Sequence, residues 1–244
     1  EVIFYNNIGF DFHNHKFSIV NYHPCYYLMP VTKLAEADSR EQSWEKIQEY
    51  HEHLLASLQD KNANKVSIWL ASKIFVDLKG KTFLELGCGA GRNLIFIHKY
   101  IRNAKTTGVD INNNAIDVAR GQLKNKSSEL ILGSIYDLSR FADNSIDVVF
   151  TCGVLMHIPH EKVVDIVKQM NRIARLAVLH FELDGPSHNF DYHRYPRDYQ
   201  KLYHQIGLDK ITTYKLFPPT DYRSNMAPPF THALLVSKPK QLPR

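Results

Sequence analysis

Hydrophobic and polar positions in the middle of the chain follow two different periods. Short apolar runs typical of strands occur at 82–86, 106–109, 130–132, 146–150 and 176–181. Between them lie stretches in which apolar residues recur every three or four positions, at 92–101, 113–123 and 161–173. Strands that alternate with helices predict a parallel sheet covered by helices on both faces.

Two further helices are predicted before the first of these strands. Ser39 and Gln42 have the spacing of a capping box, and apolar residues at helical spacing follow from Trp44 to Leu58. The polar run 60–64 separates this helix from a second one, whose apolar residues lie between 66 and 75.

The C-terminal part completes the pattern. A helix is predicted to begin near Pro196 and to end at Gly207. Apolar runs at 211–216 and 233–237 predict two strands that a Pro-rich loop joins without a helix between them. We therefore expect an α/β, Rossmann-like fold: a seven-stranded, mostly parallel sheet with one antiparallel edge strand and helices on both faces.

The first 36 residues are rich in aromatic side chains and histidines and show no helical period, which predicts irregular or extended structure. This aromatic-rich extension is either an arm packed on the main domain or a wall of a substrate pocket. The pattern divides the chain into an N-terminal arm and cap helix, residues 1–60, and a main domain, residues 61–244.

Composition narrows the class of protein. The chain has 244 residues, of which 44% are hydrophobic and 23% are charged, values that are ordinary for a globular protein. No apolar run approaches the roughly 18 residues of a membrane span, and no secretion signal is visible. Three widely spaced cysteines indicate reduced thiols in a cytoplasmic protein and no zinc site. The net charge of +5 is scattered along the chain, so it permits nucleic acid as a partner without indicating it.

The strongest chemical signal is the segment 83–91, in which a strand runs into three glycines at alternate positions. Glycine permits backbone angles that a Cβ atom forbids and lets a ligand approach the main chain. About twenty residues later the next strand ends at Asp110, where a carboxylate can accept hydrogen bonds from a ribose. A dinucleotide site would place a third glycine at the position of Arg92.

The order Gly-x-Gly-x-Gly after Glu85 resembles motif I of class I S-adenosylmethionine-dependent methyltransferases, and the resemblance covers roughly residues 64–238. It implies S-adenosyl-L-methionine as cofactor and S-adenosyl-L-homocysteine as product. By this resemblance Glu85 faces the methionine amino group and Asp110 binds the ribose hydroxyls. The cofactor-binding residues it implies are Glu85, Gly87, Cys88, Gly89, Gly91, Asn93, Asp110, Ile111, Ser134, Ile135, Thr151 and Gly153.

Two later segments extend the likeness. Residues 133–138 look like the adenine-binding loop of the family, with Ser134 in place of the usual acid, and residues 147–159 look like motif IV. The Lys-Pro-Gly-Gly turn that often precedes the fifth strand is absent, and residues 172–175 take its place.

Methyl transfer to a hydroxyl or an ammonium benefits from a general base beside the cofactor. The candidate catalytic residues are His157, Glu182 and His193, and the candidate substrate-binding residues are His157, Tyr192, His193 and Arg194. His157, together with the strand-end pair His180 and Glu182, could equally have a structural role. The segment 188–199 is either a polar loop or a substrate contact, in which Arg194 and Arg197 could pair with a carboxylate or phosphate.

The function that these residues favour is methyl transfer to an oxygen or nitrogen of a small polar metabolite, such as a sugar or a natural-product intermediate. Residues 153–159 look similar to methylases of bacterial surface-sugar biosynthesis. RNA methylation and a non-catalytic partner subunit are the alternatives. The Asn-Pro-Pro-aromatic signature of amino-group methylases is missing, since residues 151–154 stand there. We expect a small-molecule substrate, with no membrane, metal or nucleic acid as partner.

Overall fold

The structure of the protein is a computed structural model. The structure describes residues 2–5, 8–11, 17–18, 44, 55–56, 58–59, 61–182, 195, 197–215 and 232–237. Within these residues, the helices lack the length and the continuous apolar surface of a membrane span. The division into residues 1–60 and 61–244 remains a prediction, because most of the N-terminal region lies outside the described residues, as do the capping-box residues Ser39 and Gln42.

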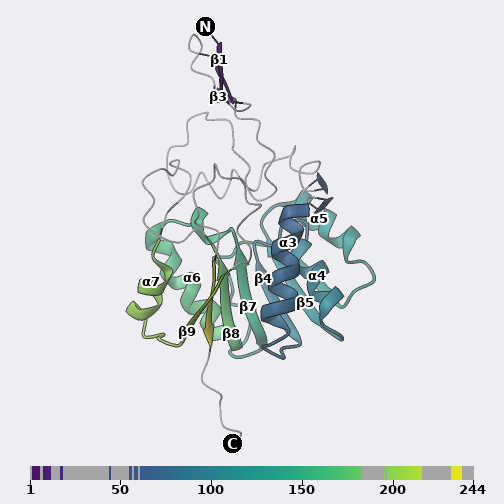
Figure 1. Ribbon diagram of the computed structural model, residues 1–244. Coiled ribbons are helices and arrows are strands. Elements are labelled where there is room, and N and C mark those ends of the chain that lie inside the picture. Colours follow the sequence, from purple (N-terminus) through teal and green to yellow (C-terminus); the bar gives the residue numbers. More distant parts are fainter. Residues whose placement is uncertain are drawn as a thin grey trace, which may run out of the picture.

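The main sheet has the strand order β6-β5-β4-β7-β8-β10-β9 (Figure 1). Five of its strands are parallel: β4 (Thr82–Leu86), β5 (Lys105–Asp110), β6 (Ser128–Leu132), β7 (Ile146–Cys152) and β8 (Ala174–Phe181). This confirms the predicted Rossmann-like α/β fold with a parallel sheet. The strand order reverses between β4 and β7, which in such sheets is where ligands bind beyond the carboxyl ends of the strands.

The predicted antiparallel edge strand is wrong in its position. β10 (His232–Ser237) pairs antiparallel with β8 on one side and with β9 (Ile211–Lys215) on the other. The antiparallel strand is therefore second from the edge, and β9 at the edge runs in the direction of the parallel strands. The chain order alone did not reveal this, because the later strand inserts between β8 and the earlier one.

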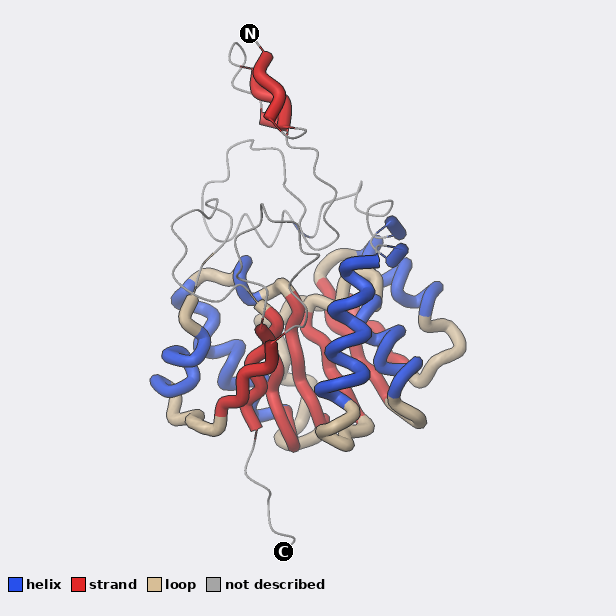
Figure 2. The backbone as a smooth tube through the Cα atoms, viewed as in Figure 1, coloured by secondary structure: helices blue, strands red, loops and turns tan. Residues whose placement is uncertain are grey.

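Helices cover both faces of the sheet (Figure 2). On one face, α3 (Lys61–Trp69), the wider helical turn η1 (Leu70–Phe75) and α4 (Arg92–Tyr100) pack on Phe83, Val148 and Phe150. On the other face, α6 (His160–Ile173) and α7 (Tyr199–Gln205) pack on Leu84, Val149 and Val178. Adjacent residues of a strand thus enter opposite cores, as the two-residue period requires. Helix α5 (Asn113–Gln122) packs beside β5 and β6.

Helix α7 begins later than the sequence predicted. It starts at Tyr199, and the Asp198 side chain accepts a hydrogen bond from Lys201 N at 2.8 Å as its N-cap. The cap at Asp198 decides the start of the helix, because its side chain satisfies an otherwise unpaired amide of the first turn. In the N-terminal region, Val2–Tyr5 (β1), Ile8–Asp11 (β2) and Phe17–Ser18 (β3) form a small antiparallel sheet.

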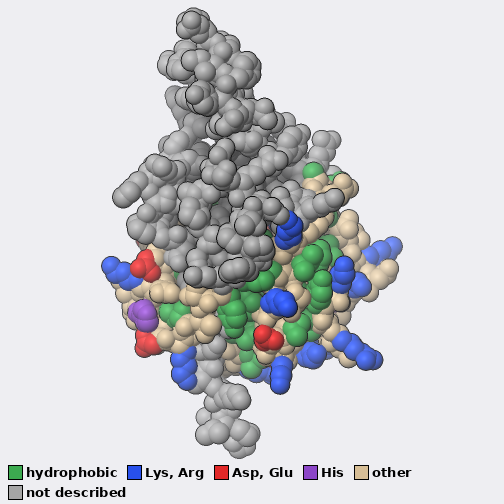
Figure 3. Space-filling model, in the orientation of Figure 1, with side chains coloured by type: hydrophobic (Ala, Val, Ile, Leu, Met, Phe, Trp, Pro, Cys, Tyr) green, Lys and Arg blue, Asp and Glu red, His purple; other side chains and the backbone are tan. Residues whose placement is uncertain are grey.

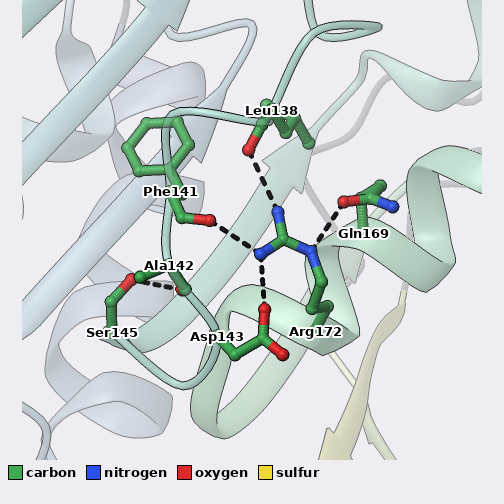
Figure 4. A network of polar contacts seen from close by, with 7 residues as sticks. All are labelled: Leu138, Phe141, Ala142, Asp143, Ser145, Gln169 and Arg172. Atoms are coloured by element: carbon green, nitrogen blue, oxygen red, sulfur yellow. Dashed lines mark hydrogen bonds and ion pairs between the residues drawn. The ribbon is translucent and has the colours of Figure 1, made fainter.

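Two arginines stand where the family's Lys-Pro-Gly-Gly turn is missing. Helix α6 ends at Ile173 and β8 begins at the next residue, so there is no loop between them. Arg172 donates from its guanidinium to the carbonyl oxygens of Leu138 and Phe141, as well as to Asp143 and Gln169 (Figure 4). Arg175 forms an ion pair with Asp147 at the start of β7. Side chains therefore fix this connection in place of a glycine turn.

Candidate active site

The glycine turn after β4 has a conformation that only glycine adopts without strain. Gly87, Gly89 and Gly91 have φ angles of 72°, 51° and 78°. A Cβ atom on Gly87 would lie 2.4 Å from Val154 Cγ2, which belongs to the turn after β7. Gly91 is the N-cap of α4, and its carbonyl accepts from Ile95 N at 2.9 Å. The turn therefore exposes main chain between two strand ends.

Asp110 at the end of β5 lies in direct contact with this turn. Gly89 N donates to Asp110 Oδ2 at 2.8 Å, and Asn112 N donates to Asp110 Oδ1 at 2.9 Å. Burial raises the pKa of Asp110, while these backbone hydrogen bonds oppose the rise. Each carboxylate oxygen has two lone pairs, so both can still accept hydrogen bonds from a ligand's hydroxyls.

Glu85 ends a chain of buried side chains. Ser67 Oγ donates to Asn93 Oδ1 at 2.5 Å, and Asn93 Nδ2 donates to Glu85 Oε1 at 2.6 Å. Burial raises the pKa of Glu85 to about 8, and the hydrogen bond from Asn93 partly offsets this rise. Glu85 Oε2 is buried and accepts no hydrogen bond from the described residues. An acceptor left in this state costs about 1–3 kcal/mol, which a ligand with a donor group would recover.

The loop that resembles the adenine-binding segment starts beside Asp110. Gly133 N donates to the carbonyl oxygen of Asp110 at 2.9 Å, and the Ser134 hydroxyl accepts from Tyr136 N at 3.2 Å. Ile111 is half-buried, and Ile135 packs against the core cluster of α6 and α7. This loop follows β6, which lies on the other side of β5 from β4, so it begins on the side of Asp110 away from Glu85.

Three of the predicted cofactor-binding residues already use a side chain or a main-chain amide in hydrogen bonds to other protein atoms. Cys88 is buried in the core on the α4 side, and its amide donates to Val109 O at 3.0 Å. Thr151 Oγ1 and His180 Nδ1 are 2.7 Å apart, and Gly153 N donates to Phe181 O at 2.9 Å. Any contact of these three residues with a cofactor would therefore use their remaining main-chain atoms.

His180 is enclosed. Its Nε2 atom is hydrogen-bonded to the Tyr203 hydroxyl, and its ring stacks on Tyr199 at 5.8 Å between centroids. Burial lowers the pKa of His180 to about 3, so its ring is neutral at physiological pH. Both ring nitrogens thus have protein partners, and His180 links β7 and β8 to α7.

Two side chains, one acidic and one basic, bind the main chain of the turn that carries His157. Glu182 accepts from Val154 N at 2.9 Å and from Met156 N at 3.3 Å, and burial raises its pKa. Arg197 is buried and donates to the carbonyl oxygens of Leu155 and Ile158. The expectation that Arg197 pairs with a carboxylate or phosphate is therefore wrong, because its guanidinium binds main chain.

His157 itself lies half-buried at the end of η2 (Leu155–His157). Its ring is 5.1 Å from the ring of Trp44, in an edge-on arrangement. The other predicted acceptor-side residues, Tyr192, His193 and Arg194, lie outside the described residues.

Four residues of the site escaped the sequence reasoning: Trp44, Ser67, Asn112 and Tyr203. Asn112 had a usable signal, since an Asn directly before a predicted helix is a typical N-cap, and its Oδ1 accepts from Ala115 N at 2.9 Å. Ser67, Trp44 and Tyr203 come from distant segments, so no local pattern indicated them.

The residues at these strand ends fit an S-adenosylmethionine molecule. The unpaired Glu85 oxygen matches the methionine ammonium, the glycine turn leaves room for main-chain contact, and the Asp110 carboxylate matches a ribose diol. Within the described residues, no cluster of His, Cys, Asp or Glu could hold a metal ion.

Comparison with known proteins agrees with this arrangement. Residues 83–176 match the family described as "Methyltransferase domain". The chain is 28% identical over 95 residues to a fatty-acid O-methyltransferase of Mycolicibacterium smegmatis, a match covering 39% of this chain and 34% of that protein. It is 26% identical over 106 residues to a phthiotriol/phenolphthiotriol dimycocerosates methyltransferase of Mycobacterium tuberculosis, covering 43% and 39% of the two chains. The matches thus span little more than a third of these relatives.

Solved structures share the fold over most of the chain. The plantazolicin methyltransferase BpumL in complex with SAH superposes with a TM-score of 0.61 at 17% identity, covering 83% of this chain and 95% of that one. A magnesium protoporphyrin IX methyltransferase from Synechocystis PCC 6803 with bound SAM gives a TM-score of 0.55 at 13% identity, covering 85% and 98%. Residues 83–176 therefore match a methyltransferase domain, and the solved structures show that the chain shares its fold with methyltransferases.

Proposed function

We propose, from the methyltransferase domain as premise, that this protein transfers a methyl group from S-adenosylmethionine to an oxygen or nitrogen of a small molecule. The observation that carries the proposal is the 2.8 Å hydrogen bond from Gly89 N to Asp110 Oδ2. It joins the glycine turn and the ribose-binding carboxylate into one site at the point where the strand order reverses.

Bound S-adenosylmethionine supplies a methyl group on a sulfonium, which is electrophilic without further activation. The chain's task is then to orient the two reactants and to exclude water, and orientation can contribute up to about 7–11 kcal/mol. Glu85 holds the amino acid end through its unpaired oxygen, and Asp110 holds the ribose. The turn after β7, which Glu182 and Arg197 fix, forms the acceptor side.

His157 is our candidate for the group that faces the acceptor and takes its proton. Glu182 and His180 are less suited to this role, because both carboxylate oxygens of Glu182 and both ring nitrogens of His180 bind protein atoms. Removal of a general base lowers the rate by about 10²–10⁴-fold. We therefore expect His157→Gln to lower kcat and to leave the affinity for S-adenosylhomocysteine within a factor of two.

Two classes of acceptor are supported by different observations. The local likeness of residues 153–159 to sugar methylases supports a small polar metabolite, such as a sugar or natural-product intermediate. The relatives, which are named for a fatty acid and for dimycocerosate lipids, support an acyl lipid. RNA is less supported: on the face seen in Figure 3, the described Lys and Arg side chains are spaced apart. The intact glycine turn argues against a non-catalytic partner subunit.

The test begins with calorimetric titration of the purified protein with S-adenosylhomocysteine. Transfer of tritium from methyl-labelled S-adenosylmethionine is then measured with three panels: fatty acids, nucleotide-linked sugars and total RNA. We expect saturable binding and label in one of the first two panels. Absence of binding refutes the methyltransferase proposal. Label in RNA alone refutes the small-molecule acceptor.

The same titration is carried out with two variants: Asp110→Asn is the test and Asp117→Asn is its matched control. Both changes remove one carboxylate charge within eight residues of each other, but Asp117 is an exposed residue of α5 that pairs with Arg120. Loss of affinity in Asp110→Asn alone assigns the binding to the strand end, and equal loss in both variants contradicts this assignment.

A further inference from the structure

Trp44 contacts residues that follow the strands on either side of β4, although it is about forty residues before the glycine turn in sequence. Its main-chain oxygen accepts a hydrogen bond from Asn112 Nδ2 at 2.8 Å. Asn112 is buried, its amide donates to Asp110 Oδ1, and its side-chain oxygen caps α5. This hydrogen bond therefore holds the Trp44 main chain against Asn112. Asn112 is two residues after Asp110, whose carboxylate binds the ribose in the proposed function.

The indole ring of Trp44 reaches the opposite side of the site. Its centroid is 5.1 Å from the centroid of the His157 ring, with 62° between the planes. His157 belongs to the turn after β7, whereas Asn112 follows β5, and β4 lies between these two strands. Neighbouring strands are about 4.8 Å apart, so a residue that contacts both outer ends must cross the end of β4. The glycine turn is at that end.

A second residue from the same part of the chain supports this placement. Leu58 packs against Ala90, Ala115 and Val118, and its carbonyl accepts from Asn64 Nδ2 at 3.1 Å. Ala90 lies within the glycine turn. Two described residues of the N-terminal region therefore contact the edge of the sheet at which the cofactor fits.

We propose that Trp44 is a functional residue of this site: its indole closes the space above the glycine turn and orients the His157 ring toward the methyl acceptor. This inference rests on the proposed function. A flat aromatic ring beside the sulfonium excludes water and interacts favourably with a cation at its face. The edge-on contact limits rotation of the imidazole, and such ring pairs are specific in their geometry. Trp44 is thus a wall of the cofactor site and a positioning residue for His157.

Tryptophan fluorescence tests the placement directly, because the chain has two tryptophans. Trp69 is partly buried and packs edge-on against Phe181, with 6.0 Å between the ring centroids. The variant Trp69→Phe leaves Trp44 as the sole tryptophan, and Trp44→Phe leaves Trp69. Both are titrated with S-adenosylhomocysteine, and calorimetry measures the dissociation constant independently. We expect the Trp44 emission to change with the calorimetric dissociation constant and the Trp69 emission to change far less.

The outcomes separate the two proposals. If calorimetry shows binding while the emission of Trp44 stays unchanged, Trp44 is not part of the site and the inference is overturned, but the proposed function stands. If calorimetry shows no binding of S-adenosylhomocysteine, the proposed function is refuted, and the inference about Trp44, which rests on it, is refuted with it.

Affinity provides a second measurement that does not depend on the Trp69→Phe variant. We expect Trp44→Ala to raise the dissociation constant for S-adenosylhomocysteine roughly ten-fold, and Trp44→Phe to restore it to within about three-fold of the native value. The ring resonances of His157 in a ¹H–¹³C spectrum should shift in Trp44→Ala and return toward their native positions in Trp44→Phe. Native affinity and unshifted His157 resonances in Trp44→Ala contradict the inference.

Discussion

The glycine turn allows backbone strain and steric contact to be measured separately. An alanine at position 87 would have to adopt a φ of 72° and would place its Cβ 2.4 Å from Val154 Cγ2. A non-glycine residue in the left-handed region costs roughly 1–2 kcal/mol, and overpacking of a close contact costs typically 1–3 kcal/mol. We therefore expect Gly87→Ala to lower the free energy of unfolding by about 2–5 kcal/mol.

Two other glycines supply the controls. Gly207 has a φ of 77°, and no atom of the described residues lies within 4 Å of its added Cβ, so Gly207→Ala should show strain alone, about 1–2 kcal/mol. Gly121 lies in α5 with a helical φ and with no described atom near its added Cβ, so Gly121→Ala should stabilise the protein by about 0.5–1 kcal/mol. Equilibrium urea unfolding followed by circular dichroism measures all three free energies.

The contact term is isolated by a double-mutant cycle with Val154→Ala. Removing the methyl groups that the new Cβ meets should recover about 1–3 kcal/mol of the loss in Gly87→Ala, as a coupling between the two positions. The reasoning is refuted if Gly87→Ala costs no more than Gly207→Ala, or if the two changes in the cycle are additive.

Three further predictions concern the charged residues of the site. The pKa of Glu85 is raised from 4.5 to about 8, so its contribution to stability is full below pH 4.5 and is lost as the pH rises toward 8, at up to roughly 1.4 kcal/mol per pH unit. The unfolding free energy of the native protein minus that of Glu85→Gln, measured with urea between pH 5 and 9, should fall with this slope, whereas the exposed Glu129→Gln should keep the pH dependence of the native protein. Asp110→Asn should raise the calorimetric dissociation constant for S-adenosylhomocysteine about 10–100-fold, because a charge-assisted hydrogen bond is worth about 1.5–3 kcal/mol. An unchanged dissociation constant would exclude Asp110 from the site. Arg197→Lys should destabilise the protein by about 1–3 kcal/mol, because a single ammonium nitrogen does not reproduce the fork of two guanidinium nitrogens that bind the Leu155 and Ile158 carbonyls. The exposed Arg120→Lys should stay within about 0.5 kcal/mol in the same unfolding assay.

Local patterns predicted the parts of the site that lie within one strand-turn-helix unit. Gly87, Gly89 and Gly91 stand directly after a buried strand, and Asp110 ends the next strand, so topology places them together. The cofactor contact of Asn93 stays a prediction, and the structure adds that its side-chain amide donates to Glu85, because the first turn of α4 directs it toward the end of β4. The resemblance to motif I thus located the residues, while packing assigned their partners.

The acceptor side was harder to predict because its contacts join distant segments. Glu182 and Arg197 bind the same turn from two different elements, and neither role has a signature in sequence. A carboxylate or guanidinium near a strand end looks equally suited to a substrate and to main-chain amides. The orientation of the backbone at residues 154–158 decided in favour of main chain.

By itself, the sequence determined the alternation of strands and helices, the glycine turn after β4 and the carboxylate of Asp110 at the end of β5. It could do so because the period of the apolar residues and the positions of the glycines are local properties of the chain. Only the tertiary structure decided that β10 inserts between β8 and β9, that one Glu85 oxygen accepts no hydrogen bond from the described residues, and that Trp44 spans from Asn112 to His157. These features depend on which surfaces meet when distant segments bury their apolar faces together. That choice is made by the packing of the whole chain rather than by any single segment.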